Sequence, residues 1–71
     1  MLRSLGASAP VVVSETLVVL VVEENAVFRS ITAERLRAAG FEVLEAANSA
    51  EAEQVLKSAA VDALFLSVRP Q

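Results

Sequence analysis

The 71-residue chain contains no cysteine and no histidine. Without cysteine it can form neither a disulfide nor a thiolate metal site, and nothing in the sequence indicates the redox compartment. Without histidine it lacks the commonest general base and the commonest metal ligand of proteins. We therefore do not expect this chain to be an enzyme.

An excess of basic residues is also missing. Six Lys and Arg face nine Asp and Glu, which gives a net charge of −3, and the basic residues are scattered along the chain. Phosphate binding needs a basic patch, so the composition argues against a nucleic-acid-binding surface. Arg35 and Arg37 fall on an expected helix, where we interpret them as part of a solvated face.

No hydrophobic run reaches the length of a membrane span. Residues 11–22 are strongly apolar, but a spanning helix needs ~20 residues and Glu15 interrupts the run. The N-terminal segment MLRSLGASAP lacks the apolar core of a signal peptide. We expect a cytoplasmic protein that does not associate with membranes.

What is present is a short apolar chain that forms one domain or a piece of one. Hydrophobic residues make up 55% of it, which argues against disorder. A chain of this size buries only about 60% of its unfolded surface, so its stability is expected to be small. Residues 1–15 are predicted to be a flexible tail, with VVV at 11–13 as a candidate extra strand.

Residues 16–71 alternate between strand and helix signals. Residues 16–22 and 61–67 are apolar runs of strand length, typical of strands in a parallel sheet that helices cover. Residues 41–46, FEVLEA, predict a further strand whose two glutamates suit an exposed edge. Connections between such parallel strands are right-handed in ~98% of cases.

Two amphipathic helices are predicted between these strands. Residues 26–39 carry a loose apolar stripe, and we assign its members Val27 and Ile31 to the core. Gly40 follows as a typical helix stop. The second helix begins near Asn48, where NSAE has the spacing of a capping box.

Polar side chains follow two of the expected strands. Glu23 and Glu24 come directly after the first strand, and Ser67 ends the last one. Ligands bind beyond the carboxyl ends of strands in open parallel sheets, so the three side chains share one crevice if the strands are neighbours. Adjacent carboxylates suggest a divalent cation, and an all-oxygen site suits Mg²⁺. Alternatively, the two carboxylates are simply solvated, with Glu24 or Asn25 capping the next helix.

Three segments together resemble the first half of a response-regulator receiver domain. They are VLVVEENAVFR at 19–29, LRAAGFEVLEAANSAEA at 36–52 and VDALFLSVRP at 61–70. The resemblance extends over residues 16–69 but covers only about half of a receiver. It implies a flavodoxin-like α/β fold, with a three-layer βαβαβ arrangement, a parallel sheet in strand order 2-1-3 and one helix on each face.

The resemblance also assigns roles to the polar residues. Receivers accept a phosphoryl group from a histidine kinase on an Asp that ends the third strand, and an acidic pair after the first strand holds Mg²⁺. Glu23 and Glu24 match the acidic pair, and Ser67 stands at the phosphoacceptor position. Ser67 cannot form an acyl phosphate, and no histidine can activate its hydroxyl. Glu24 is one methylene longer than the usual Asp, which suits octahedral Mg²⁺ poorly.

We therefore expect residues 16–71 to form a truncated receiver-like module of two-component, or phosphorelay, signalling. It should not be phosphorylated, should bind Mg²⁺ weakly at most through Glu23 and Glu24, and should act by protein–protein contact. The expected partners are a histidine kinase or another signalling protein, and a second copy bound through the third strand as a homodimer or higher oligomer.

Three alternatives stay open at this point. The chain could be a fragment of a longer response regulator. It could be an active receiver that a partner chain completes. It could also be a small structural or designed α/β module without a signalling role.

Overall fold

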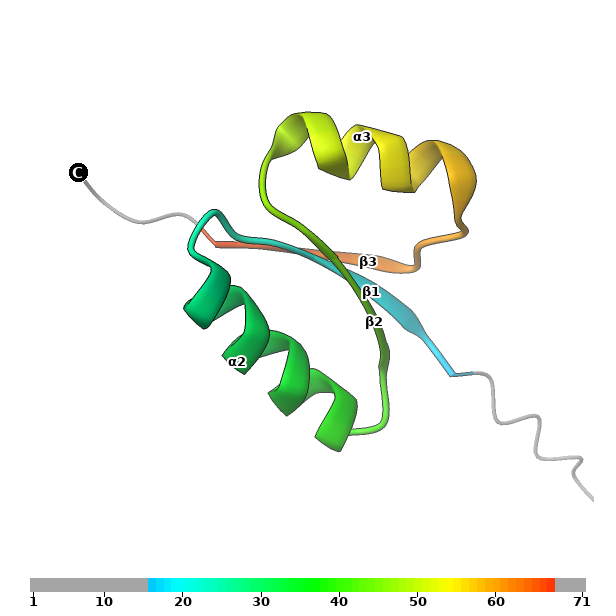
Figure 1. Cartoon of the computed structure of the whole chain (residues 1–71). Helices are drawn as coiled ribbons and strands as arrows, with labels where there is room; N and C mark the ends of the chain where they lie inside the picture. Colours follow the sequence, from blue (N-terminus) through cyan, green and yellow to red (C-terminus); the bar gives the residue numbers. More distant parts are fainter. Residues whose placement is uncertain (1–15, 68–71) are drawn as a thin grey trace, which may run out of the picture.

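The computed structural model of the chain describes residues 16–67. The predicted tail at 1–15, with its candidate strand at 11–13, lies outside the described residues. The described elements are β1 (Val18–Val22), α2 (Ala26–Ala38), β2 (Glu42–Ala46), α3 (Ser49–Ser58) and β3 (Ala63–Leu66), as Figure 1 shows. The order strand, helix, strand, helix, strand is the one that the sequence predicts.

The three strands form one parallel sheet in the order β2-β1-β3. The α/β class and the strand order 2-1-3 are thus confirmed. Val19 lies opposite Val43 on one side and Ala63 on the other, so β1 is the central strand. Its sequence VVLVV is β-branched and apolar throughout, which suits a strand with neighbours on both edges and helices on both faces.

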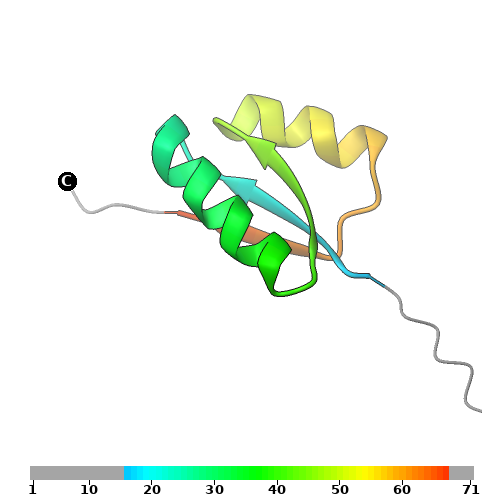
Figure 2. The same cartoon turned by 60° about the horizontal axis from the view of Figure 1, so that its bottom comes forward.

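The helices cover opposite faces of this sheet, which makes three layers (Figures 1 and 2). Successive side chains of β1 point to opposite faces, so this strand supplies two cores. Val19 and Val21 pack with Ala33 of α2, while Leu20 and Val22 pack with Ala52 of α3. Full burial of a Val or Leu side chain contributes about 1.5–3 kcal/mol. The alternation within β1 therefore joins both layers into one folded unit.

Asparagine side chains set where the two helices begin. The side-chain oxygen of Asn25 accepts two backbone N–H groups of the first turn of α2, at 2.9 and 3.0 Å. Asn48 accepts the N–H of Glu51 at 2.9 Å, and the Glu51 carboxylate accepts the N–H of Ala47 at 2.8 Å. The predicted capping pair is therefore present, with its return bond shifted by one residue toward the N-terminus.

Gly40 ends α2 as predicted, with a φ of 102° that disfavours a side chain. Its N–H donates to the carbonyl of Arg37 at 3.0 Å, and the N–H of Phe41 donates to the carbonyl of Leu36 at 3.1 Å. These two bonds define a Schellman motif. Leu36 and Phe41 both pack against the core on the α2 face, so the turn directs the chain back to the sheet.

The assignment of Val27 and Ile31 to the core is wrong. Their side chains are 64% and 44% exposed, whereas the small Ala33 is the residue of α2 that is fully buried. Residues two apart on a helix point about 200° away from each other. Once Ala33 faces the sheet, Ile31 must face away from it, and Val27 lies one turn before Ile31 on the same side. Val27 and Ile31 therefore do not belong to the buried face of this helix.

β3 pairs with β1 but is covered by neither helix. The contacts of α2 and α3 with the sheet are with β1 and β2, and all four residues of β3 are exposed. No helix within residues 16–67 is both long enough and apolar enough to span a bilayer.

Candidate functional site at the carboxyl ends of β1 and β3

The structure brings the ends of β1 and β3 together, as the predicted crevice requires. The N–H of Ser67 donates to the carbonyl of Val22 at 3.2 Å, and the register places Val22 opposite Leu66. Ser67 therefore lies beside the point where β1 ends and the chain continues into Glu23 and Glu24. All three predicted site residues belong to one end of the sheet.

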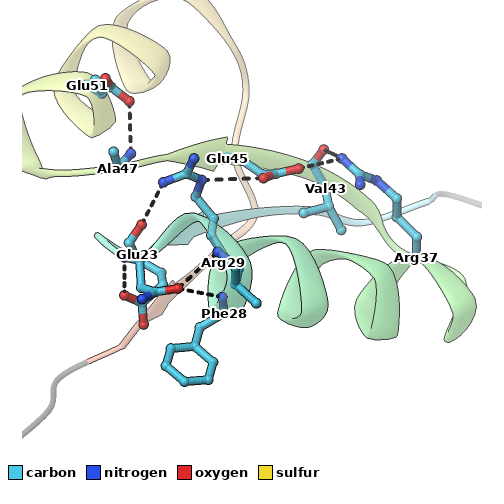
Figure 3. A network of polar contacts seen from close by, with 10 residues as sticks. Glu23, Phe28, Arg29, Arg37, Val43, Glu45, Ala47 and Glu51 are labelled. Atoms are coloured by element: carbon cyan, nitrogen blue, oxygen red, sulfur yellow. Dashed lines mark hydrogen bonds and ion pairs between the residues drawn. The ribbon is translucent and has the colours of Figure 1, made fainter.

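Glu23 is the only buried charged residue described in the range 16–67, with 5% of its surface exposed. One carboxylate oxygen, Oε2, accepts the N–H of Asn25 at 2.7 Å, a short charge-assisted bond (Figure 3). The backbone N–H of Glu23 donates to the carbonyl of Ala46 at 3.0 Å, and the backbone carbonyl of Glu23 accepts a hydrogen bond from Nη1 of Arg29 at 3.0 Å. A buried carboxylate requires such partners. Glu23 thus holds together the turn between β1 and α2.

Glu24 has a different environment, although it is the next residue. Its side chain is exposed, and it precedes Asn25, which is the N-cap of α2. Of the two residues that the sequence offered as caps, Asn25 takes the role. The carboxylate of Glu24 stays near the helix N-terminus, where the helix dipole favours negative charge. The adjacent carboxylates are therefore tolerated because one is buried with donors and the other reaches water.

The oxygen atoms near this end of the sheet come from two carboxylates and one hydroxyl. Within residues 16–67 there is no group of three or more His, Cys, Asp or Glu residues arranged to hold a metal ion. One oxygen of Glu23 already accepts a backbone N–H. Mg²⁺ requires octahedral oxygen coordination and commonly keeps several waters. Weak Mg²⁺ binding through Glu23 and Glu24 remains a prediction.

A second polar cluster, which the sequence did not indicate, connects α2 to the sheet. Nε of Arg29 lies 3.5 Å from one carboxylate oxygen of Glu45, and Nη2 of Arg37 lies 3.3 Å from the other (Figure 3). Arg37 also donates to the carbonyl of Val43 at 3.1 Å. Arg37 lies on the exposed face of α2, as the sequence predicts, with its side chain 49% exposed, and these contacts are additional. It spans from the helix to the edge strand β2.

Arg29 matters most for the site, because it bonds both the Glu23 carbonyl and the Glu45 carboxylate. Exposed ion pairs each contribute only about 0–1 kcal/mol, so the value of Arg29 lies in fixing position. It couples the turn after β1 to the end of β2. The sequence did show an arginine one turn after the Asn25 cap. It did not show that this arginine pairs with Glu45, which lies in another element of the fold.

Comparisons with protein-family models, with curated proteins and with solved structures find no match to this chain.

Proposed function

We propose that this chain is a receiver-like module of two-component signalling that does not accept a phosphoryl group and acts through protein contact. The observation that carries the proposal is that β1 and β3 end side by side, with Glu23 and Glu24 directly after β1 and Ser67 directly after β3. In the receiver resemblance these are the acidic pair and the phosphoacceptor position. The parallel sheet in the order β2-β1-β3, with a helix on each face, is consistent with half of a flavodoxin-like fold.

The chemistry of the three residues favours a module without phosphotransfer. Ser67 offers a hydroxyl where an acyl phosphate would need a carboxylate. Activating that hydroxyl requires a general base, and the chain contains no histidine. One carboxylate oxygen of Glu23 already accepts a hydrogen bond from the N–H of Asn25 in the turn before α2. A role in the cytoplasm as a binding partner of a histidine kinase or another signalling protein fits these residues better than catalysis.

A phosphodonor experiment tests the absence of phosphotransfer. The protein is incubated with acetyl phosphate and Mg²⁺, and its intact mass is measured by mass spectrometry. We expect no gain of a phosphate group. A stoichiometric gain would refute the proposal and would favour an active receiver.

A metal experiment tests the receiver-like part of the proposal. Ser67→Asp places a third carboxylate at the crevice, so its affinity for Mg²⁺ should rise by at least about tenfold. Ser58→Asp is the matched control, because it makes the same chemical change at the last residue of α3. Amide NMR shifts during a Mg²⁺ titration report both affinities.

The second candidate function is a structural α/β module without a signalling role. The hydrogen bond from the N–H of Asn25 favours it, since this bond gives the Glu23 carboxylate a structural purpose in the turn. Equal and weak Mg²⁺ binding by the two aspartate variants would favour this candidate. Such a result would mean that the carboxyl ends of β1 and β3 do not form a Mg²⁺-binding site.

A further inference from the structure

The two edges of the sheet differ in how they are protected. β2 carries Glu42 and Glu45, both exposed, and charged residues on an edge strand oppose pairing with other strands. β3 has the sequence ALFL, without a charge, and within residues 16–67 no strand pairs with its outer side. Its three large side chains, Leu64, Phe65 and Leu66, are 55%, 44% and 59% exposed. An apolar, uncharged edge strand is a template for another strand.

The register shows which backbone groups β3 turns outward. Val19 lies opposite Ala63 and Val21 opposite Phe65, and the N–H of Ser67 donates to Val22. Backbone groups of successive residues in a strand point to opposite sides. Residues 63, 65 and 67 therefore turn their N–H and C=O groups toward β1. Leu64 and Leu66 turn theirs toward the outer edge.

We propose that two copies of this chain pair β3 with β3 in antiparallel orientation, which gives a continuous six-stranded sheet. A two-fold axis perpendicular to the sheet relates the copies, so each edge is its own complement. The inference depends on the edge of the sheet alone and not on the proposed signalling function.

One register satisfies the geometry best. Directly opposite residues of an antiparallel pair point to the same face, so under this two-fold axis a residue can face only a residue of the same parity. Centring the axis on Phe65 places Leu64 opposite Leu66 of the second copy. Both turn their backbone groups outward, so they form hydrogen-bonded pairs. Centring on Leu64 instead would bring Asp62 into the ladder opposite Leu66, although the backbone N–H of Asp62 already donates to the carbonyl of Val18 at 2.8 Å.

Charge and area both suit a second copy as the occupant. Each chain has a net charge of −3, but β3 itself contributes no charge, so the paired edges bring no like charges together. Phe28 is half exposed on the flank of α2 that faces away from Glu45 and β2 (Figure 3). Phe28 and the three large side chains of β3 are each about half exposed, which leaves roughly 400 Å² of apolar surface per copy in solvent. With the strand backbone the pair buries about 1,000 Å², near the lower limit for a specific interface, so the dimer should dissociate in the micromolar range.

Disulfide cross-linking tests the register directly, because the chain has no cysteine of its own. Phe65 faces Phe65 of the second copy as a non-hydrogen-bonded pair, with Cα atoms about 4.5 Å apart. That spacing allows a disulfide. Under mild oxidation Phe65→Cys should give at least about five times more covalent dimer than Glu42→Cys, which places the thiol on the other edge strand. Equal yields would overturn the proposed pairing.

Light scattering after gel filtration tests the assembly without a cross-link. At about 100 µM the wild-type chain should be mainly a dimer, and Leu64→Lys should raise the dissociation constant at least about tenfold. Leu56→Lys is the control, because Leu56 is 50% exposed on α3, a helix that does not contact β3. It should remain a dimer. Circular dichroism verifies that both variants stay folded.

Two results would overturn the inference. A wild-type monomer at this concentration would exclude the second copy, and protected amides of Leu64 and Leu66 in that monomer would indicate that another part of the same chain, such as residues 11–13, covers the edge. A dimer that Leu64→Lys does not weaken would place the interface elsewhere.

Discussion

Replacing Glu23 by alanine should destabilise the protein even when no metal ion is added. The substitution removes the acceptor of the Asn25 N–H, a bond of 2.7 Å, at a position where only 5% of the residue is exposed. Losing a hydrogen bond to a charged group costs about 2 kcal/mol. A domain of this size has a total free energy of unfolding of about 5 kcal/mol. The substitution should therefore remove a large share of the stability.

The same change at the next residue provides the control. Glu24 is exposed, and no hydrogen bond of its side chain is described within residues 16–67. Glu24→Ala should change the free energy of unfolding by no more than about 0.5 kcal/mol. Glu23→Gln, which keeps an oxygen acceptor and nearly the same shape, should recover part of the loss.

Urea denaturation followed by far-ultraviolet circular dichroism is the suitable assay, because the chain contains no Trp or Tyr for fluorescence. With a urea dependence of about 1 kcal/mol per molar for a small domain, the Glu23→Ala midpoint should fall by about 2 M. All proteins are compared at one chain concentration, since association contributes to apparent stability. Equal midpoints for Glu23→Ala and Glu24→Ala in metal-free buffer would refute the structural role assigned to Glu23.

Three further substitutions test the fold. Leu20→Ala should cost about 2–5 kcal/mol and leave the chain largely unfolded in a thermal melt, because Leu20 is fully buried in the central strand. Gly40→Ala should lower the urea midpoint by an amount equivalent to about 1–2 kcal/mol. No atom lies within 4 Å of the added Cβ, so the cost comes from the backbone at φ 102° alone. Val27→Ser should change the free energy of unfolding by only about 0.5 kcal/mol in the same assay, since Val27 is exposed. If Val27→Ser lowered the free energy of unfolding as much as Leu20→Ala does, Val27 would have to be a core residue after all.

The local structure could be read from the sequence because its signals are local. A run of β-branched residues predicts a strand wherever it lies, and Asn25, Asn48 and Gly40 act on backbone groups within a few residues of themselves. The parallel sheet follows from the alternation of strands and helices. The class of fold, the starts of both helices and the adjacent ends of the first and third strands were therefore predictable.

Only the tertiary structure decided which side chains are buried. Val27 and Ile31 were indistinguishable from core residues by pattern, but α2 lies on the sheet through Ala33, and this orientation turns them to solvent. The ion pairs of Arg29 and Arg37 with Glu45 likewise join a helix to a strand. No regular sequence spacing predicts such pairs.

The acidic pair shows the same division most clearly. The sequence determined that two carboxylates follow the central strand, but neighbours in sequence need not share an environment. The turn into α2 places the Glu23 carboxylate against the N–H of Asn25 and the Glu23 carbonyl against the guanidinium of Arg29, while Glu24 is exposed. Burial with donors gives one carboxylate a structural role, and solvation keeps the charge of the other available, because each responds to the groups that the folded chain places around it.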